Sequence, residues 1–275
     1  IGLPDDTRAP VKLDIPAQIL GALIMAALAT AAIASGPSGW NSLPVGVSLA
    51  AAVLLGLVLL LRRARSHIAT EKVSHGIRTA VASAGIMGFS FYGVLYFLSL
   101  HLQEQRGWSA LHTGIALLPL TISSTIGPFI YGPLNRRWIA PVVLLGGFTS
   151  VLLGTVTLLA AGSSAPFWTE VVAMLLVGGA STLCFSALTT ILVDAAPPEH
   201  MGKLSGWQNT SRQAGAMLAT ALVGSLIIGA PASHEIQATT MLVVVAAAGV
   251  SVAFIETRAS RSAAGKTAPI SARTG

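Results

Sequence analysis

The chain has 275 residues, of which 53% are hydrophobic and only 9% are charged, and its formal net charge is +6. An ordinary soluble domain carries roughly a quarter charged residues, so a chain with so few charged residues could not cover a water-facing surface with polar groups. The composition therefore indicates a protein of the lipid bilayer. The basic excess does not indicate a nucleic-acid partner, because the cytoplasmic loops of membrane proteins produce the same excess.

Cysteine and histidine usage argues against a metal centre. The single cysteine, Cys184, lies in an apolar run and excludes an intrachain disulfide, and the six histidines are scattered without the spacing of metal ligands. We expect no metal and no cofactor. The chain begins at Ile1, and no basic segment precedes its first apolar run, which we interpret as a fragment or a processed chain without a signal peptide.

Eight apolar runs follow a polar leader at residues 1–14. Their bounds are 15–34, 43–61, 79–102, 114–134, 139–161, 167–193, 204–229 and 238–255. Each is near the roughly 20 residues that a helix needs to cross about 30 Å of hydrocarbon. The predicted fold is all-α, a polytopic transmembrane bundle of about eight spans.

The placement of basic residues supports this count. With eight spans both ends of the chain lie on one side, and of the 16 Lys and Arg residues all except Arg106 and Arg212 fall on that side. A missed or additional helix would scramble this sorting. By the positive-inside rule, both ends are predicted to be cytoplasmic. The same basic residues would also suit anionic lipid, although orientation alone explains them.

An amphipathic stripe runs along the third span. It steps by three and four residues through Phe89, Tyr92, Tyr96, Ser99 and Gln103. Tyrosine combines an aromatic face with a hydroxyl group, which suits a cavity for amphipathic ligands. The alternative is that Tyr96 and Gln103 approach the membrane interface, where such residues are common.

The seventh span has a polar face where a soluble amphipathic helix would have an apolar one. Small or hydrogen-bonding residues share that face: Gly202, Gly206, Asn209, Gln213, Ala216, Thr220 and Gly224. Two roles fit Asn209 and Gln213, hydrogen bonding to neighbouring helices or lining a cavity. Arg212 lies a few turns from the start of this span, so we expect it to reach the cytoplasmic interface or pair with a loop.

The remaining polar features point away from catalysis. The acidic residues lie near span ends, none at the middle of an apolar run, so no proton-carrying acid is evident. Signatures of hydrolases, phosphate-binding loops and paired catalytic carboxylates are missing, so we expect no enzyme. The third, fourth, sixth and seventh spans hold the polar content and would bound a polar path. The fifth and eighth are expected to face lipid.

Three stretches together resemble one family. Gly132-Pro-Leu-Asn135-Arg136-Arg137 looks like a G-x-L-[AD]-D-R loop motif, with Asn135 where aspartate is usual. Residues 98–119 are similar to a YLQ…G-x-S-x-x-x-x-G-x-x-x-L-P stretch. Residues 198–215 look like a G-x-x-x-G-x-x-N-x-x-R-x-x-G signature through Gly202, Gly206, Asn209, Arg212 and Gly215. The combination resembles the major facilitator superfamily, in its fourteen-helix drug/proton antiporter branch.

The resemblance implies the C-terminal portion of such a transporter. Residues 15–61 would be the linker hairpin, 62–78 a basic cytoplasmic loop, 79–255 the six-helix C-terminal half and 256–275 a disordered cytoplasmic tail. It implies export of drugs or small metabolites across the cell membrane by proton antiport, with alternating access about a central site. The proton gradient would be the energy source. The N-terminal half would be a partner, without which the chain should not transport.

The implied substrate is a small amphipathic molecule. Its cavity would be lined by the third, fourth, sixth and seventh spans, with Phe89, Tyr92, Tyr96, Gln103, Asn209 and Gln213 as candidates. Two alternatives come from other classes. The first is a non-transporting membrane scaffold or truncated gene remnant, and the second is a membrane-embedded enzyme, which would need clustered acids, His or Cys at bilayer depth.

Overall fold

The chain is described by a computed structural model, which covers residues 15–38, 42–65, 74–162, 165–197, 200–227 and 233–267. The described residues are helical apart from short connections, and no strand occurs among them. The chain divides into two compact units, Ile1–Ala69 and Thr70–Gly275. The predicted leader at residues 1–14 lies outside the described residues. The all-α fold is confirmed.

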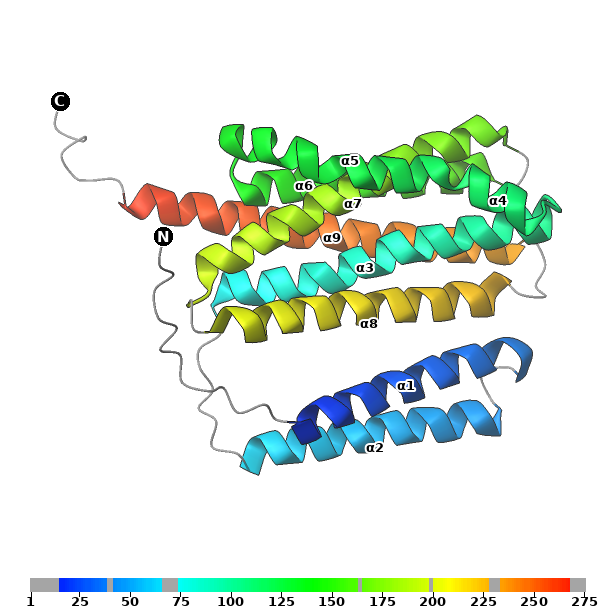
Figure 1. Ribbon diagram of the computed structural model, residues 1–275, viewed down its shortest axis with the longest axis horizontal. Helices are drawn as coiled ribbons and strands as arrows, with labels where there is room; N and C mark the ends of the chain where they lie inside the picture. Colours follow the sequence, from blue (N-terminus) through cyan, green and yellow to red (C-terminus); the bar gives the residue numbers. More distant parts are fainter. Residues whose placement is uncertain are drawn as a thin grey trace, which may run out of the picture. The chain divides into compact units, whose positions relative to one another are not determined.

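The first unit is a hairpin of α1 (Ile15–Ser38) and α2 (Leu43–Arg65), which run antiparallel and pack against each other (Figure 1). Small and β-branched side chains at Ala31, Val45 and Ala52 are buried in this unit. Most other apolar side chains of the pair point outward, as Leu43 and Val53 do. A two-helix unit with so much exposed apolar surface suits lipid or another protein surface better than water.

The second unit contains the remaining elements. They are α3 (His75–Leu100), η1 (His101–Gln105), α4 (Ala110–Ala116), α5 (Leu118–Arg137), α6 (Ala140–Ala161), α7 (Phe167–Ala195), α8 (Met201–Ile227) and α9 (Ser233–Thr267). Helix α3 is central, because it packs on α7, α8 and α9. Helix α7 also packs on α5 and α6, and α6 packs on α9 (Figure 1).

Two of the predicted spans are interrupted. The third widens into the π-helical turn η1 at His101, and Gly107, with φ of 67°, then takes the chain out of the helix. The fourth begins earlier than predicted, at α4, and breaks at Leu117 before continuing as α5. Pro119 explains the break, because it lacks the N–H that would bond back across the junction.

The last helix is longer than predicted. Residues 256–275 were expected to form a disordered tail, but α9 continues to Thr267 and residues 268–275 lie outside the description. The first residues of this extension have partners on other helices. Glu256 lies 3.2 Å from the imidazole Nε2 of His75, and Thr257 donates a hydrogen bond of 3.1 Å to the carbonyl of Pro141.

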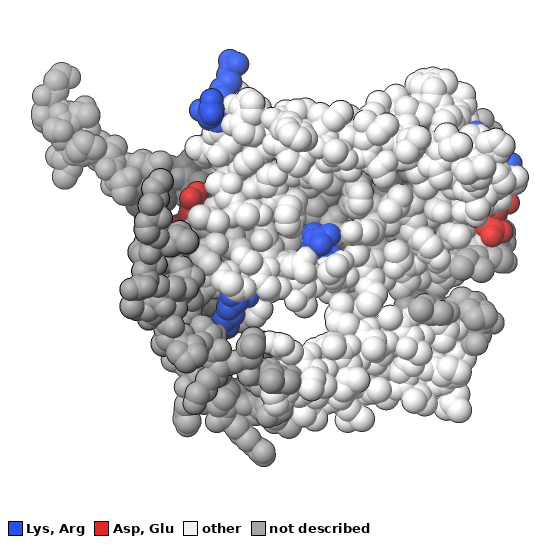
Figure 2. All heavy atoms as spheres, viewed as in Figure 1, with Lys and Arg blue, Asp and Glu red and all other residues white. Residues whose placement is uncertain are grey.

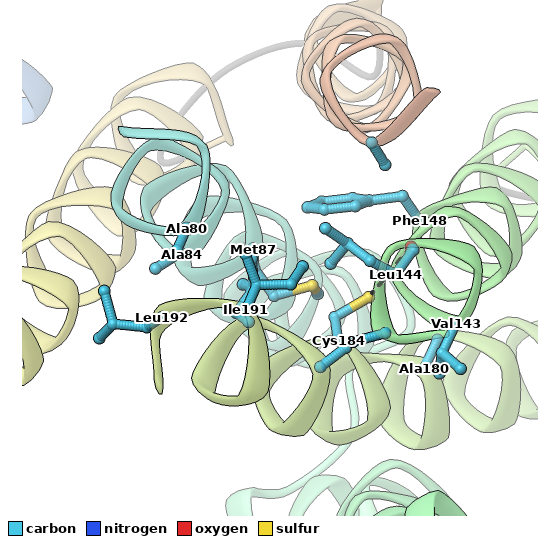
Figure 3. Packing of buried hydrophobic residues seen from close by; sticks show 14 of the residues in the cluster. Ala80, Ala84, Met87, Val143, Leu144, Phe148, Ala180, Cys184, Ile191 and Leu192 are labelled. Atoms are coloured by element: carbon cyan, nitrogen blue, oxygen red, sulfur yellow. Dashed lines mark hydrogen bonds between the residues drawn. The ribbon is translucent and has the colours of Figure 1, made fainter. Parts of the chain in front are cut away.

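The core of the second unit is made where α3, α6, α7 and α9 meet. Figure 3 shows Met87, Phe148 and Cys184 converging from three of these helices. The ring of Phe148 occupies the space that a Cβ at Gly249 would need, so a glycine on α9 lets a large ring lie against its backbone. Close packing between helices is what stabilises a bundle in lipid, where burial of apolar surface drives little.

Five helices or helix pairs in the described residues are long and apolar enough to cross a membrane. They are His75–Gln105, Ala110–Arg137, Ala140–Ala161, Phe167–Ala195 and Glu235–Ser260, and α1 and α2 contain shorter apolar stretches. Helix α8 is long enough but carries Arg212 and several amides in its first half. It is therefore the polar member of a membrane bundle.

Candidate functional site

A close seam between α3 and α8 positions the polar residues of both helices. Cβ atoms at Gly88 or Gly215 would overlap backbone carbonyl oxygens across the seam, those of Arg212 and Gly85 respectively. Glycine is needed at both places because the two backbones touch. Small residues in such spacing are the usual means by which membrane helices approach closely.

The side chain of Arg212 leaves this seam and joins α3, α7 and α8. Its Nη1 donates to the Tyr92 hydroxyl at 3.4 Å, and its Nη2 donates to Asn209 Oδ1 at 2.9 Å. Its guanidinium carbon lies 5.6 Å from the centre of the Phe185 ring on α7, within cation–π range. The buried Nε–H has no acceptor among the described residues. One cation is thus held by neutral groups.

The position of Arg212 along α8 agrees with the few turns that the sequence places before it. Arg212 is the twelfth residue of α8, so it lies about 17 Å along the axis from Met201 at 1.5 Å per residue. Of its two hydrogen-bond partners, Tyr92 lies across on α3 and Asn209 lies three residues nearer the start of α8. Its predicted place at the cytoplasmic interface stays a prediction.

The other predicted cavity residues occupy different settings. Tyr96 is half-buried and lies against Gly224 of α8, where a Cβ would come within 3.1 Å of its ring. Phe89 is half-buried beside the core. Gln103 bonds to its own helix, donating to the carbonyl and the hydroxyl of Ser99 at 3.0 and 3.1 Å. Gln213 is exposed. Tyr92 and Asn209 are therefore the pair that the structure joins, through Arg212.

The polar face of α8 divides along its length. Its first part is exposed at Gly202, Gly206, Asn209 and Gln213, whereas Ala216 and Gly224 are buried. The first part of this face therefore presents Asn209 and Gln213 outward, and the part from Ala216 to Gly224 packs inside the second unit.

The predicted loop motif lies at the end of α5. Gly132, Arg136 and Arg137 are exposed and Asn135 is half-buried, all inside the last turns of that helix. No ion pair among the described residues involves them.

A second polar cluster, which the sequence prediction missed, is buried where α3 passes into η1. His101 Nδ1 lies 2.9 Å from Glu235 Oε1, and its Nε2 lies 3.5 Å from Glu170 Oε1. Arg106 pairs with the same Glu170 oxygen and donates to the Ala165 carbonyl at 2.6 Å. Exposures of 3% for His101, 3% for Glu170 and 7% for Glu235 remove the cluster from solvent.

This cluster joins the ends of three helices. The two carboxylates lie in the first turns of α7 and α9, where the helix dipole favours negative charge. When the His101 imidazole carries both protons, His101 and Arg106 are two positive charges that balance the two carboxylates. The signal was present in the predicted topology, since alternating spans put residues 101–106, 170 and 235 on one side. The prediction assessed each acid singly and so described the acids as peripheral.

The surface of the helices is mostly apolar. In Figure 2 the described surface is almost uncharged, with basic atoms near the middle of the face and others toward its rim. The fifth and eighth spans were expected to be the most exposed to lipid, but only 22% of the most apolar part of Ala110–Arg137 is buried, against 44% for α6 and 33% for α9. Of the spans singled out for polarity, His75–Gln105 and Phe167–Ala195 are the most enclosed, with 56% and 50% of their most apolar parts buried, and Ala110–Arg137 is the exception. An apolar groove between α5, α6 and α7 contains none of the predicted cavity residues.

Comparison with known proteins gives a consistent answer. Residues 17–220 match the family model described as Major Facilitator Superfamily. The chain is 28% identical to the methylenomycin A resistance protein of Streptomyces coelicolor, over 81% of this chain and 47% of that protein. It is 31% identical to the tetracenomycin C resistance and export protein of Streptomyces glaucescens, over 80% of this chain and 42% of that protein.

A third relative is the multidrug resistance protein Stp of Mycobacterium tuberculosis, 29% identical over 78% of this chain and 41% of that protein. The chain thus spans about half the length of the relatives it matches, or somewhat less. The family match covers most of the chain, and its helices are those of a membrane bundle. The chain belongs to the Major Facilitator Superfamily, a family of membrane transporters.

Proposed function

We propose that this chain is the C-terminal portion of a secondary active transporter that exports drugs or small metabolites by proton antiport. The observation that carries the proposal is its similarity, along about four fifths of its length, to proteins named for antibiotic resistance and export. Those proteins are about twice as long, so the other half of the transporter would supply the opposite wall of the cavity. The chain alone would not transport.

The cavity of this half lies along the seam of α3 and α8. Tyr92, Tyr96, Asn209 and Gln213 present aromatic faces, hydroxyls and amides on helices that are otherwise apolar, which suits amphipathic cargo. Exchange of access between the two sides of the membrane would come from rocking of the two halves about this region. The close, glycine-lined contact of α3 and α8 supports a half that moves as one body.

The orientation follows from charge. Arg136 and Arg137 are exposed at the end of α5, and Arg258 is exposed toward the end of α9. We place these ends in the cytoplasm by the positive-inside rule, so that the chain is a multi-pass protein of the cell membrane with both ends inside. The His101 cluster would then lie toward the outer face.

The test uses the complete transporter polypeptide that carries this chain, in inside-out vesicles energised by a proton gradient. Transport of methylenomycin A, tetracenomycin C and ethidium is measured together with proton flux. We expect uptake of at least one compound with matching proton efflux, and its loss when Tyr92, Tyr96, Asn209 and Gln213 are changed to alanine. Unchanged transport and ligand binding in that variant would contradict the proposal that these four residues line the cavity. Residues 1–275 expressed alone should show no uptake.

A further inference from the structure

We propose that Arg212 is a binding site for a carboxylate, so that the cargo includes lipophilic organic acids. This inference rests on the proposed function and narrows it to a class of substrate. The acid group would lie on the guanidinium of Arg212, and the apolar body of the ligand against Phe185 and Tyr92.

The first argument is the missing counter-charge. A cation within a membrane-spanning segment is costly unless it is paired, and intramembrane charges usually have a partner. None of the ion pairs among the described residues involves Arg212, whereas Arg106 pairs with Glu170. The neutral acceptors Tyr92 and Asn209 orient the guanidinium without neutralising it.

The second argument is unused hydrogen-bonding capacity. A guanidinium has five N–H donors in a planar fork that matches a carboxylate. Arg212 makes one hydrogen bond of 2.9 Å and one of 3.4 Å, and its Nε–H has no acceptor among the described residues. A carboxylate is a stronger acceptor than a phenol or an amide, so it would compete successfully for these donors.

The third argument is that the surroundings suit the rest of such a ligand. Phe185 is 41% exposed on α7, and the half-buried Tyr92 meets Phe91 edge-on with ring centres 5.2 Å apart. Flat apolar surface therefore lies next to the single charge. A free inorganic anion would gain nothing from these rings, whereas an aromatic or aliphatic acid would bury its body against them.

The experiment compares three probes that share a naphthalene ring and differ in charge: 1-naphthoate, 1-naphthamide and 1-naphthylmethylammonium. Their affinities for the complete transporter are measured in phosphatidylcholine nanodiscs by isothermal titration calorimetry. We expect naphthoate to bind at least about tenfold more tightly than the amide, because a charge-assisted hydrogen bond favours the anion by that much or more. The ammonium compound should bind most weakly.

Variants assign that preference to one residue. R212Q should abolish the naphthoate preference while naphthamide binding stays within about twofold, and R212K should retain part of it, because lysine keeps the charge and loses the fork. R258Q is the matched control, since Arg258 also stacks on a phenylalanine, with its guanidinium carbon 4.4 Å from the ring centre of Phe254, but far along α9. It should leave the preference unchanged.

Four results would overturn the inference. The first is equal affinity for naphthoate and naphthamide in the unaltered protein. The second is an undiminished preference in R212Q. The third is that R212Q and R212K each bind all three probes more weakly by the same factor, which would show that Arg212 pairs with an acid elsewhere in the transporter. The fourth is loss of the preference in nanodiscs containing phosphatidylglycerol, which would assign the cation to lipid. Binding with this pattern but no transport would instead retract the proposed function alone.

Discussion

The two charged regions of this bundle differ in how their charges are satisfied. At one end of α3, the buried residues His101, Glu170 and Glu235 and the half-buried Arg106 form a set in which every residue has an oppositely charged or hydrogen-bonded partner. Midway along α8, Arg212 has only neutral partners. Paired charges at helix ends stabilise the packing of the helices, whereas an unpaired cation contributes little to the stability of the fold and is available to a ligand.

The largest effect should come from breaking the paired set. Glu170→Ala leaves Arg106 and His101 facing a single remaining carboxylate, and loss of one partner from a buried pair costs about 3–5 kcal/mol. A titration with SDS in mixed micelles measures the free energy of unfolding. Glu104→Ala is the control, because Glu104 is exposed at the same end of α3. Equal losses for the two variants would show that the cluster does not fasten the helices.

The contact that positions Arg212 should come next. Gly215→Ala puts a methyl group against the carbonyl of Gly85, and such overpacking costs about 1–3 kcal/mol. Gly206→Ala lies on the same helix with nothing within 4 Å of its added methyl group, so it should be neutral or stabilise by up to about 1 kcal/mol. The same titration compares the two. If both alanines behaved alike, α3 and α8 would not be in backbone contact.

Removal of the unpaired cation should matter much less to folding. In Arg212→Gln the hydrogen bonds to Tyr92 and Asn209 weaken, but the cost of holding an unpaired charge among apolar helices disappears. We expect the free energy of unfolding to change by less than about 1 kcal/mol. A loss close to that of Glu170→Ala would mean that Arg212 has a structural partner of opposite charge, contrary to the comparison above.

The smallest effect should be at the long hydrogen bond from Arg212. Tyr92→Phe removes an acceptor at 3.4 Å, a weak contact, and should cost about 0.5 kcal/mol or less. Tyr131→Phe removes a 2.8 Å hydrogen bond to Thr190 and should cost about 1 kcal/mol. The order of the two in thermal unfolding is the test, and a reversed order would mean that Tyr92 bonds more strongly than its geometry indicates.

The fold was accessible to sequence reasoning because each span is a separate run of apolar residues. The run predicted at 139–161 corresponds to α6 at Ala140–Ala161, and the run at 167–193 to α7 at Phe167–Ala195. Polar side chains at helix ends were harder to assign. In the extension of α9 beyond residue 255, Glu256 and Thr257 have partners on α3 and α6, which hydropathy along the chain does not reveal.

The candidate site was only partly predictable for a related reason. Helical periodicity placed Tyr92 on one stripe and Asn209 on another, but their connection passes through Arg212 and depends on the contact at Gly88. Periodicity orders residues around one helix and carries no information on which neighbour that face meets. The His101 cluster was missed because three segments far apart in sequence, at residues 101–106, 170 and 235, meet only through the packing of helices.

The central claim is that the Arg212 region faces water inside a transport pathway, and cysteine labelling tests it most directly. In the complete transporter with Cys184 and any other cysteines replaced, Gln213→Cys is compared with Val244→Cys, a residue of α9 that is 62% exposed but apolar. A membrane-impermeant methanethiosulfonate should modify the cysteine at 213, more slowly when naphthoate is present, and leave the one at 244 unmodified. Equal reactivity at the two positions, or none at 213 from either side of the membrane, would contradict the account.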